Sequence, residues 1–228
     1  MQLLDIRWER SIWKLCREVR FHAVSRDLLL AHQSLSSQRS VSPYGQISIR
    51  SNVSGESNGP RFIFGDLTVG MNPNKTVRDA LLSITMQASS STLRKDTNVC
   101  FSMSDYACDL ALYVSQSINR VPFSLSSTQV PNNLSGSDSL RFNISLLFPH
   151  AAHPSSIDRL ATWLPMFTQS FKHMDKQWTF SKVTIEGSSS TFDAGYLQAN
   201  NLLIQTSSAE IKGTFQVNES LTLDTVDA

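Results

Sequence analysis

The last part of the chain, residues 183–228, repeats its pattern of apolar and polar positions with a step of about 19 residues. Within each unit the apolar residues lie two apart, which is the period of a strand with one buried face. Each unit therefore predicts two short strands joined by tight turns. The aligned positions are Val183/Leu202/Leu221, Ile185/Ile204/Leu223, Gly187/Thr206/Thr225, Ser190/Ala209/Ala228, Phe192/Ile211 and Tyr196/Phe215.

Two arrangements fit this repeat. One is a stack of units, because a single unit cannot bury its own apolar side whereas neighbouring units can. The other is an antiparallel meander whose strands are evenly spaced. We favour the stack, because the 19-residue frame holds without insertion. Ala228 falls within a unit, so we expect a truncated array whose last strand has an open edge.

Shorter strands are predicted upstream of the repeat. The clearest is 140–148, where Phe142, Ile144, Leu146 and Phe148 alternate with polar residues and so give one buried and one solvated face. Several strands separated by turns favour a sandwich over βαβ units. The other predicted strands are 61–70, 82–88, 99–103 and 109–114, with a short one at 46–49.

Two segments have helical spacing instead. Residues 3–32 form a basic amphipathic pattern, which is typical of a packing helix or of a helix that docks on a membrane or a partner. In residues 155–176, Ser155 or Ser156 caps one short helix, and Pro165 suits the first turn of a second. This αα element is expected to cover an open end of the sheet.

The predicted fold class is therefore mainly β: an antiparallel β-sandwich-like domain followed by stacked, β-solenoid-like repeats, with an N-terminal helix and a short αα insertion. The boundaries follow from composition. We expect an N-terminal amphipathic helix at 1–33, a flexible linker rich in Ser, Gly, Asn and Gln at 34–60, and the β domain at 61–228.

Composition excludes some partners. The net charge is +1 and charged residues make up 17% of the chain, so there is no general attraction for nucleic acid or anionic membrane. No apolar run approaches the roughly 18 residues of a membrane span, and charges interrupt the N-terminal segment, so neither a signal peptide nor an anchor is predicted. Of three cysteines, Cys100 and Cys108 are candidates for one disulfide; the alternative is that the cysteines are buried thiols.

Residues suited to catalysis, metal or cofactor binding are few. Nucleotide-binding and hydrolase motifs are absent from the sequence, so no cofactor is predicted. His150 and His153, with Asp158 nearby, have ligand chemistry but are more simply loop residues. Glu186, Gln205 and Asp224 share one position of the repeat. Five sequons are candidate N-glycosylation sites: Asn52, Asn74, Asn133, Asn143 and Asn218.

The order of these segments resembles that of a known family. The strand 140–149, the segment Leu164-Pro165-Met166-Phe167 and the repeat at Leu202–Ala209 are similar to an uncharacterised family of fungal, basidiomycete-type proteins with adhesin-like β repeats. Those repeats look like the bacterial putative-adhesin domain. The resemblance covers about residues 60–228 and implies an extracellular or cell-surface location, with no catalytic residues to carry over.

Three functional hypotheses follow. The first is a non-enzymatic adhesin-like β protein that binds a polysaccharide or a protein at a cell surface. The second is a carbohydrate-active β-solenoid enzyme, which requires carboxylates in line on successive strands; Gln205 interrupts the line between Glu186 and Asp224. The third is a truncated gene product without independent function.

Overall fold

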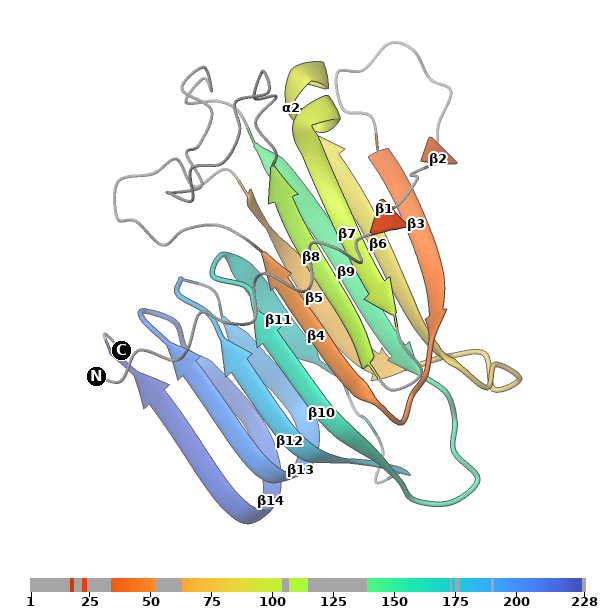
Figure 1. Cartoon of the computed structure of the whole chain (residues 1–228). Helices are drawn as coiled ribbons and strands as arrows, with labels where there is room; N and C mark the ends of the chain where they lie inside the picture. The colour runs from red at the N-terminus through yellow and green to blue at the C-terminus, as the bar shows by residue number, and fades with distance from the viewer. Residues whose placement is uncertain are drawn as a thin grey trace, which may run out of the picture.

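The computed structural model describes residues 17–18, 22–23, 34–51, 63–103, 107–114, 139–172, 174, 177–189 and 191–226 (Figure 1). These residues are almost all strand, with one short helix, α2 (Ser91–Asp96). The strands are β1 (Arg17–Glu18), β2 (His22–Ala23), β3 (Ser34–Val41), β4 (Gln46–Ser51), β5 (Ile63–Met71), β6 (Ala80–Ala88), β7 (Thr97–Met103), β8 (Ala107–Val114), β9 (Leu140–Phe148), β10 (Ser155–Trp163), β11 (Phe167–Phe171), β12 (Trp178–Glu186), β13 (Phe192–Thr206) and β14 (Ile211–Thr225).

The described strands form a single 14-stranded sheet. Its order is β1-β7-β8-β4-β10-β12-β13-β11-β5-β9-β6-β3-β2, and β14 adds to the other edge of β13. Pairs in the middle of the order, from β8 to β9, are parallel, whereas the outer pairs such as β7–β8 and β6–β9 are antiparallel. The sheet is therefore mixed, and the predicted antiparallel sandwich is wrong for its central strands.

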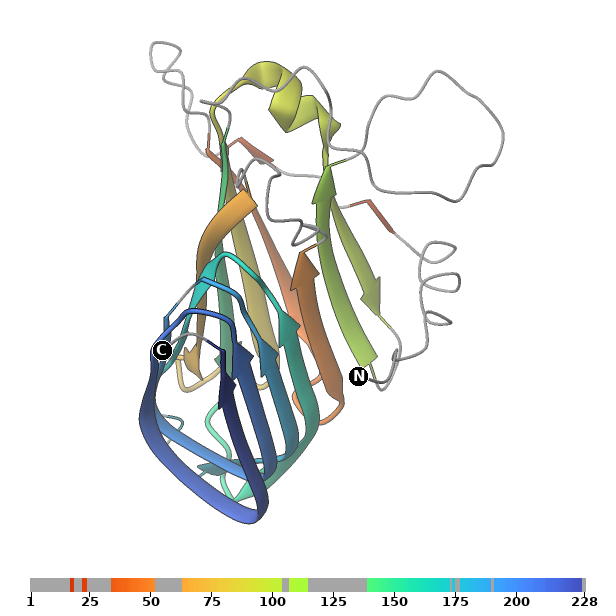
Figure 2. The same cartoon turned by 90° about the vertical axis from the view of Figure 1, so that its left-hand side faces the viewer.

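The long strand β13 makes the sheet curl on itself (Figure 2). Its start, Phe192–Ala194, pairs with β11, and its later part, from Ala199 onward, pairs with β12. One strand thus belongs to both halves of the sheet, and the halves face each other around a shared interior. The result is a nearly closed sheet, and the described residues supply no separate layer of helices over it.

Alternating apolar residues fill this interior. In β9 the residues Phe142, Ile144, Leu146 and Phe148 are buried, as the alternation predicted, and their neighbours lie on the outer side. Trp178 is the largest fully buried side chain, and its indole N–H donates to the carbonyl oxygen of Pro149 at 2.9 Å. That hydrogen bond satisfies the one polar atom of a ring otherwise surrounded by apolar groups.

The 19-residue register of the repeat is confirmed over most of its length. Val183 lies opposite Leu202 and Leu202 opposite Leu221, in parallel ladders. Leu197, not Tyr196, lies opposite Phe215, because β13 has two residues between Ala194 and Leu197 where β14 has one. A second irregularity after Ala199 restores the step. The other confirmed pairs are Ile185/Ile204/Leu223, Thr206/Thr225 and Phe192/Ile211.

A β-solenoid is not supported as the description of the domain. Strands β10, β12, β13 and β14 form a parallel stack, as a solenoid requires. The same hydrogen-bonded sheet, however, also contains antiparallel pairs on both sides of this stack. Strand β4 also lies between β8 and β10, so neighbours in the sheet are not always neighbours in sequence. We therefore describe one curled mixed sheet that contains a parallel stack.

The helical predictions are wrong wherever the structure describes the residues. Segment 155–176 contains strands β10 and β11 instead of an αα insertion. Arg17–Glu18 pairs with β7 and His22–Ala23 with β3, so the N-terminal helix over 1–33 is not supported; the rest of that segment lies outside the described residues. Among the described strands, β14 is an edge of the sheet (Figure 1).

The predicted linker is also wrong over its described part. Ser34–Val41 and Gln46–Ser51 are strands β3 and β4, and β4 lies in the middle of the sheet. The inward side chains Val41, Ile47 and Ile49 are apolar, and all three are buried. Residues 52–60 lie outside the described chain. In the described part, no helix has the length and hydropathy needed to cross a lipid bilayer.

Candidate binding surface

Five parallel strands place one side chain each in a line on the outer face of the sheet. We call this line the outer row: Arg50 of β4, Trp163 of β10, Glu186 of β12, Gln205 of β13 and Asp224 of β14. The preceding residue on four of these strands points inward and is buried: Ile49, Thr162, Ile185 and Ile204. Since successive side chains on a strand point to opposite faces, the row faces outward.

Trp163 is the distinctive member of the outer row. Its side chain is 50% exposed, although an indole is among the side chains that gain most from burial. It lies between Arg50 and Glu186 on the neighbouring strands. An indole ring presents an apolar face and one N–H donor, so Trp163 and its polar neighbours together offer both apolar and hydrogen-bonding contacts.

Gln205 and Asp224 add hydrogen-bonding groups to the outer row. The Gln205 amide Nε2 donates to the Asp224 carboxylate at 3.3 Å. With strands about 4.8 Å apart, the row from Arg50 to Asp224 spans about 19 Å. The row thus offers carboxylate acceptors and an amide at the regular spacing of the sheet.

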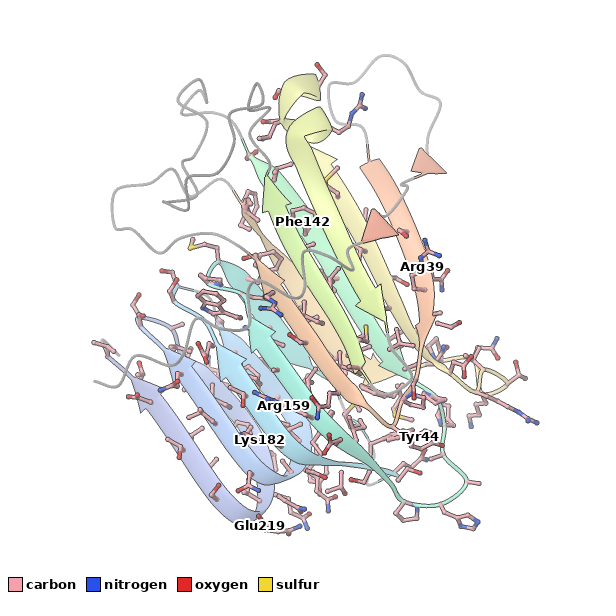
Figure 3. All side chains as sticks on the ribbon, in the orientation of Figure 1. Arg39, Tyr44, Phe142, Arg159, Lys182 and Glu219 are labelled. Atoms are coloured by element: carbon pink, nitrogen blue, oxygen red, sulfur yellow. The ribbon has the colours of Figure 1, made fainter. Side chains whose placement is uncertain are left out.

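A second line of polar residues runs beside the outer row, where the strands bend. Arg159 lies opposite Lys182, and Lys182 opposite Asn201, so two cations occupy neighbouring strands (Figure 3). Further along, Asn201 donates to Glu219 at 2.7 Å and Asn218 donates to Asn200 at 2.9 Å. These side-chain hydrogen bonds fix the bend from strand to strand.

The row predicted from the repeat is confirmed in the structure. Glu186, Gln205 and Asp224 share one position, with Glu186 opposite Gln205 and Gln205 opposite Asp224. Sequence reasoning did not include Trp163, because residues 155–176 were predicted to be helical. The signal that would have found it is the alignment of Leu160 with Val183, which has a step of 23 instead of 19 residues.

The candidate sequons lie in different settings. Asn74 is exposed in the turn after β5, where its side-chain oxygen accepts from the Thr76 backbone N–H at 3.0 Å and hydroxyl at 2.8 Å. Asn143 is exposed on β9, between Asp66 and Thr85 of the neighbouring strands. Asn218 is exposed at the bend of β14. Asn52 and Asn133 lie outside the described residues, and use of any of these sequons stays a prediction.

The disulfide predicted between Cys100 and Cys108 does not fit the ladder. Cys100 lies opposite Ala111 and Cys108 opposite Met103, on antiparallel strands β7 and β8. The two positions are therefore offset by three residues, about 10 Å along the strands. A disulfide tolerates Cα atoms no more than about 7 Å apart, so this register excludes the bridge.

The histidine positions show structural contacts. His150 hydrogen-bonds through Nε2 with the carbonyl oxygen of Asn72 at 2.9 Å, which ties the end of β9 to the turn after β5. His153 lies in the loop before β10, and its carbonyl oxygen accepts from the Ser155 hydroxyl at 3.1 Å. The described residues contain no group of three or more His, Cys, Asp or Glu that could hold a metal ion.

Comparison with known proteins leaves the family open. No family model matches the chain, and no curated protein matches it either, so the resemblance to the fungal family stays a prediction. A "putative cell adhesion protein" from Clostridium sporogenes has 10% identity and a TM-score of 0.33, covering 83% of this chain and 98% of its own. A "putative lipid binding protein" from Parabacteroides distasonis has 9% identity and a TM-score of 0.22, covering 85% and 96%. The chain is thus weakly similar in structure to these two bacterial proteins.

Proposed function

We propose that this chain is a non-enzymatic binding protein whose outer row holds an extended polysaccharide at a cell surface. The observation that carries the proposal is the half-exposed Trp163 ring in register with Glu186 and Gln205 on hydrogen-bonded parallel strands. An indole face stacks on the C–H face of a sugar ring, and carboxylate and amide groups bind its hydroxyls. One row supplies both kinds of contact.

The rigidity of the sheet supports this proposal. Each residue of the outer row lies on a strand that is paired on at least one side, so its position is fixed before a ligand arrives. Preorganised groups lose little conformational freedom on binding. The line of about 19 Å suits an elongated chain better than a single compact molecule.

Isothermal titration calorimetry tests the proposal with chitohexaose, cellohexaose and laminarihexaose as probes. We expect saturable binding of at least one of them to the wild-type chain. Trp163→Ala should weaken that binding about tenfold or more, the loss typical of an aromatic residue at the centre of an interface. No saturable heat with any probe, or equal affinity of the variant, would contradict the proposal.

Tyr44→Ala serves as the matched control. Tyr44 is an exposed aromatic residue, 62% exposed, that lies between β3 and β4 and outside the outer row. Its ring contacts Trp178 with 5.8 Å between centroids, so the melting temperature of each variant must be measured beside its affinity. The control should bind the oligosaccharide as the wild type does.

A carbohydrate-active enzyme is the second candidate, because Glu186 and Asp224 lie in the same row with one strand between them. Two interstrand spacings separate them by about 9.6 Å, near the upper limit of about 9.5 Å for the carboxyl pair of an inverting glycosidase. Release of reducing ends from the same probes, abolished by Glu186→Gln and by Asp224→Asn, would favour this candidate. We expect no such release.

A further inference from the structure

Strand β14 is the outermost strand of the parallel stack in the described chain (Figure 2). In the described chain β14 is hydrogen-bonded to β13 alone. Its inward-facing residues continue the buried columns of β13 but lack a neighbour on the far side, so Leu221 is 49% and Leu223 46% exposed. An open strand with exposed apolar side chains is a template for pairing with another strand.

The shape of β14 restricts what can pair with it. The strand bends around Asn218, where it carries one more residue than β13 between the pairs Ala199/Val217 and Asn201/Ser220. One leg, residues 211–217, continues one side of the curled sheet, and the other leg, residues 219–225, continues the next. A straight strand can cover only one leg, so full coverage requires a second strand bent at the same place.

We propose that a second copy of this chain covers the β14 edge, with the two β14 strands antiparallel about a two-fold axis through Asn218. The axis must pass through the bend, because only then does each leg of seven residues meet the other leg of its partner. Ile211 then lies opposite Thr225 of the partner subunit, and Asn218 lies opposite itself. Away from the bend, residues that face inward on one copy lie opposite inward-facing residues on the other.

The side chains in this register complement one another. Lys212 lies opposite Asp224 of the partner subunit, and this pairing of opposite charges occurs twice in a dimer. The Glu210 carboxylate bonds the Lys212 ammonium at 2.7 Å and raises the pKa of Lys212, so the cation is retained well above neutral pH. Directly opposite charges stabilise an antiparallel pair of strands.

The uncharged side chains in this register also match in polarity across the axis. Thr214 lies opposite Thr222 of the partner subunit, and Phe215 opposite the partner's Leu221, so polar meets polar and apolar meets apolar. Gly213 lies opposite the partner's Leu223; it has a φ of +151°, and a Cβ there would lie 2.6 Å from the carbonyl oxygen of Ala194 on β13. Val217 opposite the partner's Glu219 is a mismatch, but that carboxylate is already bonded to Asn201.

A closed dimer is favoured over an open filament by the other edges of the sheet. Head-to-tail addition would need an edge that complements bent β14, whereas the opposite described ends of the sheet are the two-residue strands β1 and β2. A two-fold interface uses the same surface twice and closes on itself. The dimer would bury Leu221 and Leu223 on both copies.

Sedimentation equilibrium of the full 228-residue chain, compared with charge-reversal variants, tests this proposal. We expect a reversible dimer of twice 25.4 kDa. Lys212→Asp and Asp224→Lys should each weaken dimerisation about tenfold, because each places like charges opposite one another at two sites. The double variant should regain most of the wild-type affinity. A monomeric wild type, open-ended oligomers, or a double variant no better than the singles would overturn the proposal.

A cysteine variant tests the position of the axis independently of charge. Asn218→Cys brings two identical residues together at the axis, so mild oxidation should produce a covalent dimer on a non-reducing gel. Thr222→Cys is the matched control, because it lies opposite Thr214 of the partner subunit and not opposite its own copy. The wild-type chain is oxidised in parallel, to measure any crosslink that forms through Cys16, Cys100 or Cys108. Equal crosslinking of the two variants would overturn the register.

Discussion

Leu202 and Leu221 lie directly opposite each other in the β13–β14 ladder, yet Leu202 is 1% exposed and Leu221 is 49% exposed. The two leucines occupy the same position of the repeat and differ only in whether a further strand covers them. The effect of an additional covering strand can therefore be measured by comparing Leu202 with Leu221 at the same position of the repeat.

The first prediction uses this comparison. Leu202→Ala should lower the free energy of unfolding by about 3 kcal/mol, because it removes buried methyl groups and leaves a cavity. Leu221→Ala should cost less than about 1 kcal/mol in dilute solution, because its side chain is half solvated already. Urea denaturation at low protein concentration measures both. Equal losses would contradict the assignment of β14 as the edge.

The second prediction concerns the close approach of β5 and β9 at Gly65. A Cβ at this position would lie 1.8 Å from the carbonyl oxygen of Phe142, a backbone atom that cannot move without shifting the strand. Gly65→Ala should destabilise the fold by about 3 kcal/mol.

Gly70→Ala, in the same strand, is the control for this prediction. A Cβ there would meet the Lys172 side chain at 3.2 Å, which relaxes more easily than backbone. It should cost about 1 kcal/mol or less. Thermal unfolding of the two variants side by side gives the answer, and a similar drop in both would show that the backbone contact at Gly65 is not the cause.

The third prediction concerns a buried pair of polar side chains. The Thr162 hydroxyl donates to the Gln169 side-chain oxygen at 2.7 Å, and both residues are buried. Thr162→Val should cost about 1–3 kcal/mol, because it leaves that oxygen without a donor. The double variant Thr162→Val/Gln169→Leu should be close to wild type in stability, since neither polar group remains. A double variant worse than the single would refute this account.

The fourth prediction concerns the sequons. Asn74 lies in an exposed turn, with its side chain already turned toward Thr76 of its own sequon. We expect Asn74 to be the most fully glycosylated of the described sequons when the chain is routed through a eukaryotic secretory pathway. Peptide mass spectrometry before and after enzymatic deglycosylation measures occupancy at each site. An unmodified Asn74 beside a modified Asn143 would contradict it.

The sequence was sufficient to predict the register of the repeat. The two short strands predicted in each unit are wrong, because β13 and β14 are each one bent strand of 15 residues. A strand buried on one face must repeat apolar residues two apart, and stacked strands must repeat the whole unit, so Val183, Leu202 and Leu221 could be aligned from sequence alone. The outer position of Glu186 and Asp224 followed from the same frame. Alternation alone does not give the direction of pairing, because it is the same in parallel and antiparallel strands. In the repeat, the unbroken 19-residue frame favours the stack, and its strands β12, β13 and β14 do pair in parallel.

The helices predicted at 155–176 fail for a local reason. In β10 the strand bends at Asp158–Arg159, so two outward residues follow one another and the buried Ile157 and Leu160 lie three apart. Three residues is also the spacing of a helix face, and the two causes are indistinguishable in sequence. Strand β10 precedes β12 by 23 residues and not 19, so it does not align with the repeat, and Trp163 at its end was not recognised.

Contact between Trp163 and the bound polysaccharide can be followed through the indole N–H signals in a ¹⁵N–¹H correlation spectrum. The Trp163 signal is assigned by its loss in Trp163→Phe, and buried Trp178, whose N–H is bonded to Pro149, serves as the internal reference. During titration with the oligosaccharide that binds in calorimetry, the Trp163 signal should shift saturably while the Trp178 signal stays in place. A Trp163 signal that moves no more than that of Trp178 would show that the oligosaccharide binds away from the Trp163 ring.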